Sequence, residues 1–319
     1  MKVSVLLPVY GVENYIGQCA ESLFAQTFPD IEYIFVDDCT RDRSISVLRE
    51  VMARFPQRAA QVTIVSQDRN RGLGAARLKA LQHATSDYVM HVDSDDALPL
   101  DAVEKLYNRI VETGADIVDG GYADICEGRV LREFKPDKHG KEAYLKMMLC
   151  QNVTSNRIWG RIYRRSLYTD NQVLPVEGID YSEDFCLVTR LMLHARRAWI
   201  DDVVYHYRND NSGSYTHQRS EKNMLSMFRA QAQVNNYFRE HDTEGTYATA
   251  LQIGALNACR EALRNGFSLE RAEALIDYVP RGFVPRLCLG MLRRRWPMPL
   301  FRVVYLAWRR LYVSFGCRC

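Results

Sequence analysis

Short apolar segments alternate with helix-like segments over the first two hundred residues of this 319-residue chain. The predicted strands are residues 3–9, 31–36, 62–65, 88–92 and 117–118, and the predicted helices between them are residues 15–25, 44–55, 75–84 and 101–112. Such alternation is typical of βαβ units, which build a mainly parallel sheet covered by helices on both faces. We therefore predict an α/β fold for this part of the chain.

Polar and small residues follow the predicted strands at the points where the strands end. The carboxyl ends of parallel strands meet at one edge of the sheet, where ligands usually bind. The residues at these ends are Pro8, Val9, Tyr10 and Glu13, then Asp37 and Asp38, then Asn70 and Gly72, then Asp93, Ser94, Asp95 and Asp96. Each group has a local alternative, since proline can end a strand and aspartates can cap a helix or form a turn. Their joint occurrence favours one binding crevice.

The acidic tetrad Asp93–Asp96 closes the apolar run of residues 87–92. Carboxylates crowded at the end of a buried strand repel one another unless a cation or hydrogen-bond donors offset the repulsion. In extended backbone, Asp93 and Asp95 point to the same side. Such hard oxygen ligands suit Mg²⁺ or Mn²⁺, which take their other ligands from water and substrate phosphates. We expect a divalent metal here, with an Asp-rich turn as the alternative.

Motifs, charge and cysteine usage argue against several other classes of protein. The chain has no complete Gly-x-Gly-x-x-Gly or Walker A motif, which argues against dinucleotide and P-loop sites. The net charge is +3, but nine arginines and no acidic residue follow Asp277, so the basic character belongs to the tail and does not indicate nucleic-acid binding. No secretory signal precedes the first strand, and the nine cysteines form no Cys-x-x-Cys pair, which favours a cytoplasmic protein.

Four motifs in order resemble those of family 2 of the inverting glycosyltransferases. They are residues 5–10 (VLLPVY), 35–42 (FVDDCTRD), 70–77 (NRGLGAAR) and the tetrad Asp93–Asp96. The resemblance continues through residues 159–167, 181–185 and 205–208, and covers about the first 220 residues. Cys39 departs from the family pattern, which usually has glycine after the paired aspartates.

The resemblance implies a GT-A catalytic domain over residues 1–218, with a Rossmann-like, mainly parallel sheet and helices on both faces. The residue pattern after this domain predicts a helical C-terminal region over residues 219–319 with a basic amphipathic tail. The resemblance also implies that Asp37 or Asp38 contacts the base or ribose of a nucleotide sugar, and that Asp95 binds the metal on the diphosphate. Asp93 would face the ribose or a metal-bound water. The other residues expected around the nucleotide sugar are Pro8, Val9, Tyr10, Glu13, Asn70, Gly72 and Ser94.

Glu183 and Asp184 precede a helical pattern, so we expect them near a helix start, where the helix dipole favours a carboxylate. Helix capping is the local alternative. Transfer to an acceptor hydroxyl needs a general base that takes its proton. With the resemblance, we predict Asp184 as this base, with Glu183 beside it in the catalytic site.

Trp159 and Arg161 are candidate acceptor-site residues, because aromatic faces stack on sugars and arginine binds anionic groups. Packing in the core is the alternative for both. His217, which follows the last matched segment, is a further candidate metal ligand beside Asp93 and Asp95.

Residues 300–315 form the last of several helical patterns after residue 218. One face of this helix carries Phe301, Val304, Tyr305, Trp308, Leu311, Tyr312 and Phe315, with arginines beside or opposite it. Such a helix suits an anionic membrane surface, and packing on the catalytic domain or on a partner is the alternative. No apolar run reaches the roughly 20 residues that span a bilayer.

We therefore predict a metal-assisted inverting glycosyltransferase of the hexosyltransferase type. Its predicted donor is a nucleotide-diphosphate sugar, in particular a UDP-sugar. The predicted acceptor is a glycan or lipid-linked saccharide in cell-surface polysaccharide biosynthesis. The predicted location is the cytoplasm, peripheral at the inner face of the cell membrane. The alternatives are a sugar nucleotidyltransferase, which would release pyrophosphate, and a non-catalytic module that binds sugar nucleotides or glycans.

Overall fold

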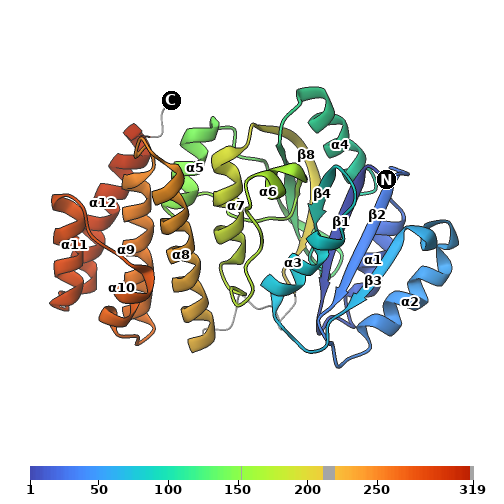
Figure 1. Cartoon of the computed structure of the whole chain (residues 1–319), viewed down its shortest axis with the longest axis horizontal. Coiled ribbons are helices and arrows are strands. Elements are labelled where there is room, and N and C mark those ends of the chain that lie inside the picture. Colours follow the sequence, from blue (N-terminus) through green and yellow to red (C-terminus); the bar gives the residue numbers. More distant parts are fainter. Residues whose placement is uncertain (152, 211–219, 317–319) are drawn as a thin grey trace. The chain divides into compact units, whose positions relative to one another are not determined.

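The computed structural model describes residues 1–151, 153–210 and 220–316, which divide into two compact units (Figure 1). Unit 1 comprises Met1–Pro136, Arg157–Asp180 and His194–His217. Unit 2 comprises Asp137–Asn156, Tyr181–Leu193 and Gln218–Cys319. The last segment of unit 2 begins where the sequence composition changes, and two earlier segments of the chain also belong to this unit.

Unit 1 is built on an eight-stranded sheet with the order β3-β2-β1-β4-β7-β5-β6, in which β8 also pairs with β5. The strands are β1 (Val3–Val9), β2 (Ile31–Asp37), β3 (Val62–Ser66), β4 (Tyr88–His91), β5 (Ile117–Cys126), β6 (Arg129–Phe134), β7 (Arg161–Arg164) and β8 (Arg197–Arg208). Strands β1 to β4 are parallel to one another where they pair, whereas β7 runs antiparallel to β4 and β5. All seven residues of β1 are buried, as expected for a strand covered on both faces.

The helices of unit 1 are α1 (Ile16–Phe24), α2 (Ser44–Arg54), the 3₁₀-helix η1 (Pro56–Gln61), α3 (Leu73–His83), α4 (Ala102–Thr113) and α6 (Ser166–Asp170). Helices α1 to α4 connect parallel strands, and the short helix α6 follows β7. Helix α3 packs on β1 and β2, α4 packs on β5, β7 and β8, and α1 packs on α2 (Figure 1). The predicted α/β architecture of a mainly parallel sheet with helices is confirmed.

Unit 2 is helical. Its helices are α5 (Lys141–Leu149), α7 (Glu183–His194), α8 (Glu221–His241), α9 (Ala248–Arg264), α10 (Leu269–Ile276), α11 (Phe283–Arg293) and α12 (Met298–Gly316). The last residue of α7, His194, is assigned to unit 1. Helices α8, α9 and α10 pack on one another, and α9 also contacts α5 and α11 (Figure 1). None of the helices within residues 1–151, 153–210 and 220–316 combines the length and apolar content that crossing a bilayer requires.

Candidate active site

The carboxyl ends of β1, β2 and β4 lie side by side, because β1 pairs with β2 on one side and with β4 on the other. Val9 is in register with Asp37 across β1 and β2, and Leu6 is in register with His91, two residues before Asp93. The order of the strands reverses between β1 and β4, and open parallel sheets bind ligands at such a point. The structure thus brings together the strand ends that the sequence analysis placed in one crevice.

The two aspartates after β2 have different environments. Asp38 is 3% exposed, and its carboxylate accepts the backbone N–H groups of Arg71 (2.7 Å) and Gly72 (2.9 Å) and the side-chain amide of Gln67 (2.8 Å). Burial raises the pKa of Asp38, although these donors act in the opposite direction. Asp37 is only half-buried. Asp38 therefore anchors the loop after β3, and Asp37 is the carboxylate of this pair that remains accessible.

Of the four predicted site residues at the end of β1, three pack or hydrogen-bond within the protein and one, Tyr10, exposes its ring. Pro8 and Val9 are buried, and the Val9 carbonyl accepts the Asp38 backbone N–H at 3.1 Å. The carboxylate of Glu13 accepts the backbone N–H of Arg43 at 2.8 Å, immediately before α2. Tyr10 is 50% exposed. Of these four, Tyr10 offers a ring to a ligand, and Glu13 joins two loops.

Glycine is required where the loop after β3 enters α3. Gly72 has φ +90°, and a Cβ atom there would lie 2.3 Å from Oδ1 of Asp180. Asp180 is 5% exposed, and the same oxygen accepts the backbone N–H of Gly74 at 3.2 Å. Gly72 thus allows the close approach of a distant carboxylate. Asn70, two residues earlier, is exposed in the loop.

Asp96 anchors the acidic turn after β4. It is 2% exposed, its Oδ2 accepts the hydroxyl of Tyr205 at 2.7 Å, and its Oδ1 accepts the backbone N–H of Arg208 at 2.7 Å. Burial, together with the neighbouring carboxylates of Asp95 and Asp93, raises the pKa of Asp96 well above its ordinary value. Both partners come from β8, so this strand fixes the turn.

The other two aspartates of the turn are half-buried. Oδ1 of Asp93 lies 3.1 Å from Nη2 of Arg77, a guanidinium that is only 2% exposed, and the Asp93 backbone N–H donates to the Tyr205 hydroxyl at 3.1 Å. The Asp95 carbonyl accepts Nε of Arg208 at 2.9 Å. Ser94, between them, is buried.

The donor set of this turn fits a divalent cation that keeps most of its ligands outside the protein. Among the described residues, no three His, Cys, Asp or Glu side chains cluster as a complete metal cage would require. Asp93 and Asp95 supply two accessible carboxylates, and Mg²⁺ or Mn²⁺ commonly combines one or two carboxylates with water and substrate phosphates. His217, the third predicted ligand, lies outside the described residues.

Arg77, Tyr205 and Arg208 hold the acidic turn, and the sequence analysis gave none of them a role. All three lie in segments that carry the family resemblance, residues 70–77 and 205–208. No local pattern marks them, because their partners are distant in sequence: Tyr205 contacts Asp96 across more than one hundred residues.

Glu183 and Asp184 occupy the first turn of α7, where acidic side chains were expected, and both are half-buried. Ser182 precedes them with φ +65°, and its carbonyl accepts the backbone N–H of Cys186 at 3.0 Å. The two acids belong to unit 2 and are described within that unit alone. Their position near positive helix-dipole charge favours the ionised carboxylate.

Trp159 and Arg161 lie in the core of unit 1. Trp159 is 9% exposed and stacks on Tyr205, with ring centroids 4.4 Å apart. Arg161 is 1% exposed and forms an ion pair with buried Asp119, which is also paired with Arg197. Burial tends to raise the pKa of Asp119, but the two arginines hold it below its ordinary value. These positions do not support the predicted acceptor contacts, and core packing accounts for both side chains.

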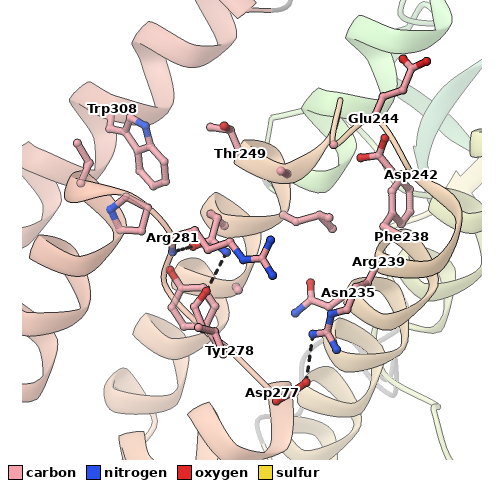
Figure 2. A pocket seen from close by; sticks show the side chains of 18 of the residues that line it. Asn235, Phe238, Arg239, Asp242, Glu244, Thr249, Asp277, Tyr278, Arg281 and Trp308 are labelled. Carbon is pink, nitrogen blue, oxygen red and sulfur yellow. Dashed lines mark hydrogen bonds and ion pairs between the residues drawn. The ribbon is translucent and has the colours of Figure 1, made fainter.

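Unit 2 contains a pocket of about 860 Å³ (Figure 2). Its lining comes from α8, α9, the segment before α11, and α12. Phe238, Tyr278 and Trp308 contribute aromatic surface, while Arg239 forms an ion pair with Asp277 at 3.1 Å. This pocket was not predicted, because its walls come from helices and connecting loops that are separated in sequence.

The sequence matches a known family and several curated proteins. Residues 4–171, more than half of the chain, match the family described as Glycosyl transferase family 2. Glycosyltransferase GlyG of Streptococcus pneumoniae is 32% identical over 66% of this chain and 72% of its own length. Glycosyltransferase GlyA of the same organism is 30% identical over 73% of this chain, which spans only 34% of GlyA.

The fold matches solved structures of named glycosyltransferases. Staphylococcus aureus TarS 1–349 in complex with UDP aligns with a TM-score of 0.65 and 21% identity, over 97% of this chain and 92% of that chain. The mannosyltransferase PcManGT of Pyrobaculum calidifontis, in complex with GDP-Man and Mn²⁺, aligns with a TM-score of 0.54 and 19% identity over 99% of this chain and 87% of that chain. At these identities the likeness shows the fold, and it confirms the predicted GT-A fold followed by a helical region.

Proposed function

We propose a reaction for this protein from the premise that the chain belongs to glycosyl transferase family 2 and is therefore a glycosyltransferase. The reaction is transfer of a sugar, with inversion at the anomeric carbon, from a nucleotide-diphosphate donor to a saccharide hydroxyl. The observation that carries the proposal is the meeting of Tyr10, Asp37 and the turn Asp93–Asp96 at the strand-order reversal. Family membership disfavours the two alternatives, a nucleotidyltransferase and a non-catalytic module.

We propose a UDP-sugar as the donor. TarS has been solved with UDP and with UDP-GlcNAc, whereas PcManGT has been solved with GDP-Man, so the base is a matter for experiment. In this chain, Tyr10 supplies an exposed ring on which a base can stack, and Asp37 supplies an accessible carboxylate for the base or ribose. Asn70 lies in the loop that Asp38 and Gly72 position. Pro8, Val9 and Glu13 shape this side of the pocket.

We propose that Asp95 and Asp93 hold a divalent metal, Mn²⁺ or Mg²⁺, with Ser94 between them at the donor. Such a metal, when bound, stabilises the negative charge that builds on the departing diphosphate. The protein's own contribution is to fix the two carboxylates: Asp96 ties the turn to β8, and the Arg77 guanidinium offsets part of the charge on Asp93. Asp93 and Asp95 thus stay close together despite their like charges, and both remain half-buried.

We propose Asp184 as the general base, with Glu183 beside it. An acceptor hydroxyl has a pKa far above neutrality, so its attack on the anomeric carbon requires transfer of its proton to a carboxylate. Helix α7 presents Asp184 in its first turn, where the helix dipole favours the ionised carboxylate, the form that can accept a proton.

The acceptor we propose is a cell-surface polysaccharide or its lipid-linked precursor. Relatives of this chain include poly(ribitol-phosphate) β-glucosyltransferase of Bacillus spizizenii, 28% identical over 67% of this chain and 33% of that protein. A lipid-linked precursor would place the reaction in the cytoplasm, at the inner face of the membrane.

The test is nucleoside diphosphate release from UDP-, GDP- and dTDP-sugars, with Mn²⁺ or Mg²⁺ and again with EDTA. We expect release from one donor, its loss with EDTA, and a nucleoside diphosphate as the product. Asp95→Ala should weaken donor binding in the presence of metal by about tenfold or more. Pyrophosphate as the product, or equal turnover with EDTA, would contradict the proposed chemistry.

Asp184→Asn should lower turnover by about 10²- to 10⁴-fold while leaving donor binding nearly unchanged, because the base acts only as the acceptor attacks. Glu221→Gln is the matched control, since Glu221 is an acid in the first turn of another helix of unit 2. Glu183→Gln separates the two neighbouring acids. An Asp184→Asn variant with near-wild-type turnover would remove Asp184 from the mechanism.

A further inference from the structure

The C-terminal segment of unit 2 carries a strongly one-sided charge. After Asp277 it contains nine arginines and no acidic residue, over a segment that forms α11 and α12. Arg293, Arg294 and Arg295 are consecutive and exposed at and just beyond the end of α11, and Arg302 and Arg310 are exposed on α12. Arg293 forms an ion pair with Glu273 of α10, which offsets its charge. A surface of this charge attracts anions, and its own like charges oppose contact with a second copy of itself.

The face of α12 that was predicted to meet a membrane is turned inward in its first half. Phe301 is 1% exposed and Tyr305 is fully buried. Trp308 lines the pocket of unit 2, where Figure 2 shows its ring beside the segment before α11. Packing, the alternative interpretation of this helix, accounts for these three aromatic side chains.

An apolar stripe of α12 that shares Leu311 with the predicted membrane face is exposed. Leu300, Val303 and Leu311 are 45%, 66% and 58% exposed, and exposed Ala307 lies between the last two. Their spacing of i, i+3, i+7 and i+11 places them in one line along the helix. Trp296, just before α12, is 45% exposed. Apolar side chains of this size and alignment are costly to leave in water, which marks the stripe as a contact surface.

We infer that this stripe and the arginines around it form a docking surface for an anionic lipid bilayer. A helix with an exposed apolar line and flanking arginines lies in the plane of the interface, with its apolar side chains among the acyl chains and its cations at the headgroups. Each cation close to an anionic leaflet adds to the attraction, and the attraction weakens with salt. The inference goes beyond the transferase reaction and does not depend on it.

The charge of the segment favours a bilayer over the other occupants of such a stripe. A second copy would bring two arginine-rich surfaces together, whereas anionic headgroups neutralise them. An acidic protein partner is the remaining occupant, and the assay below distinguishes it because it uses the protein and vesicles alone.

The test is co-sedimentation of the full-length protein with vesicles of phosphatidylcholine alone or of phosphatidylcholine with an equal amount of phosphatidylglycerol. We expect binding to the anionic vesicles only, with reversal by salt. The triple variant Leu300→Ser, Val303→Ser and Leu311→Ser should raise the dissociation constant at least about tenfold. The variant Arg294→Gln, Arg295→Gln and Arg310→Gln should do the same and should also reduce the salt dependence.

The matched control is Val130→Ser with Leu131→Ser, two side chains on β6 that are 53% and 61% exposed. This control should bind vesicles as the wild type does. Thermal unfolding followed by circular dichroism shows whether each variant folds without relying on the proposed reaction, so that failure of docking and failure of that reaction give different results. Equal sedimentation of the wild type and the apolar triple variant would overturn the inference. A wild-type dimer that the triple variant dissociates, without vesicle binding, would overturn it in favour of a self-interface.

Discussion

The hydroxyl of Tyr205 is the most sharply testable contact in the site. It donates to Oδ2 of Asp96 at 2.7 Å and accepts the backbone N–H of Asp93 at 3.1 Å, and the tyrosine is fully buried. Burial, with the nearby carboxylates of Asp96 and Asp93, raises the pKa of Tyr205 well above its ordinary value, so the hydroxyl stays protonated. Tyr205→Phe removes one atom and breaks both contacts to the acidic turn.

The expected loss of stability follows from the groups that remain without this oxygen. The Asp96 carboxyl group keeps the Arg208 N–H at 2.7 Å but loses a donor, and leaving a buried acceptor without its partner costs about 1–3 kcal/mol. The Asp93 N–H loses its acceptor, which costs about 1 kcal/mol or more. We therefore expect a decrease of about 2–4 kcal/mol in the free energy of unfolding. Because Asp93 and Asp95 then lose their fixed position, kcat/KM should fall about 10- to 100-fold.

The matched control is Tyr163→Phe. Tyr163 is also fully buried in unit 1, but its hydroxyl donates to the Ile158 carbonyl at 2.9 Å. The control should cost about 1 kcal/mol and leave the Mn²⁺ dependence of turnover unchanged. Urea unfolding gives the stabilities, and a Mn²⁺ titration of nucleoside diphosphate release gives the metal dependence. If the two variants have the same stability and the same Mn²⁺ dependence, β8 does not position the acidic turn.

Gly72→Ala should lower the free energy of unfolding in urea by about 2–4 kcal/mol, because it combines an unfavourable φ with a clash against the Asp180 carboxylate. The control Gly114→Ala, whose Cβ would meet nothing within 4 Å, should lower it by about 1 kcal/mol. Equal losses for the two variants would refute the close approach of Asp180 to Gly72. Glu32→Gln should cost about 1–2 kcal/mol at neutral pH, because hydrogen bonds from Ser4, Thr85 and Ser86 outweigh burial and lower the pKa of Glu32. A lowered pKa stabilises the folded state above the unfolded value, so the difference from wild type should shrink as the pH falls below about 4.5, and a constant difference would contradict this. Asp38→Asn should destabilise the protein by about 1–3 kcal/mol, since its amide would face the N–H groups that the carboxylate accepts. Asp37→Asn should weaken donor binding with little change in the free energy of unfolding. The reverse pattern would exchange the roles of the two residues.

The sequence was sufficient to predict the parallel half of the sheet. Strands β1 to β4 are mainly apolar segments bounded by polar loops, and β1 spans Val3–Val9 as predicted. Strand β7 was not predicted, because its four residues Arg161–Arg164 include two arginines. Its place in the sheet depends on Asp119, which neutralises buried Arg161 from a neighbouring strand. A charge that pairs across more than forty residues leaves no local pattern, so the sequence alone does not show that Arg161 is paired in the core.

The C-terminal helix shows the same limit on another scale. The periodicity of residues 300–315 predicted a helix, and α12 spans Met298–Gly316. Which side it buries is a property of its neighbours, because apolar residues cover more than half of its circumference and two adjacent stripes are both suitable for burial. Tyr305 is buried and Val303 is 66% exposed, although the two are separated by only one residue.

Both acidic pairs of the site combine one buried and one accessible carboxylate. At Asp37–Asp38 and at Asp95–Asp96 the second residue is 3% and 2% exposed and accepts backbone N–H groups from a distant segment, while the first is half-buried. Asp38 directly follows β2, where successive side chains point to opposite sides, whereas Asp95 and Asp96 lie in the turn beyond β4, where contacts with β8 bury Asp96. In each pair the oxygens of the buried member satisfy donors from a distant segment, which an apolar side chain would leave without partners. Adjacent aspartates at a strand end therefore indicate one anchor and one ligand, and burial, which the sequence alone does not reveal, decides which is which.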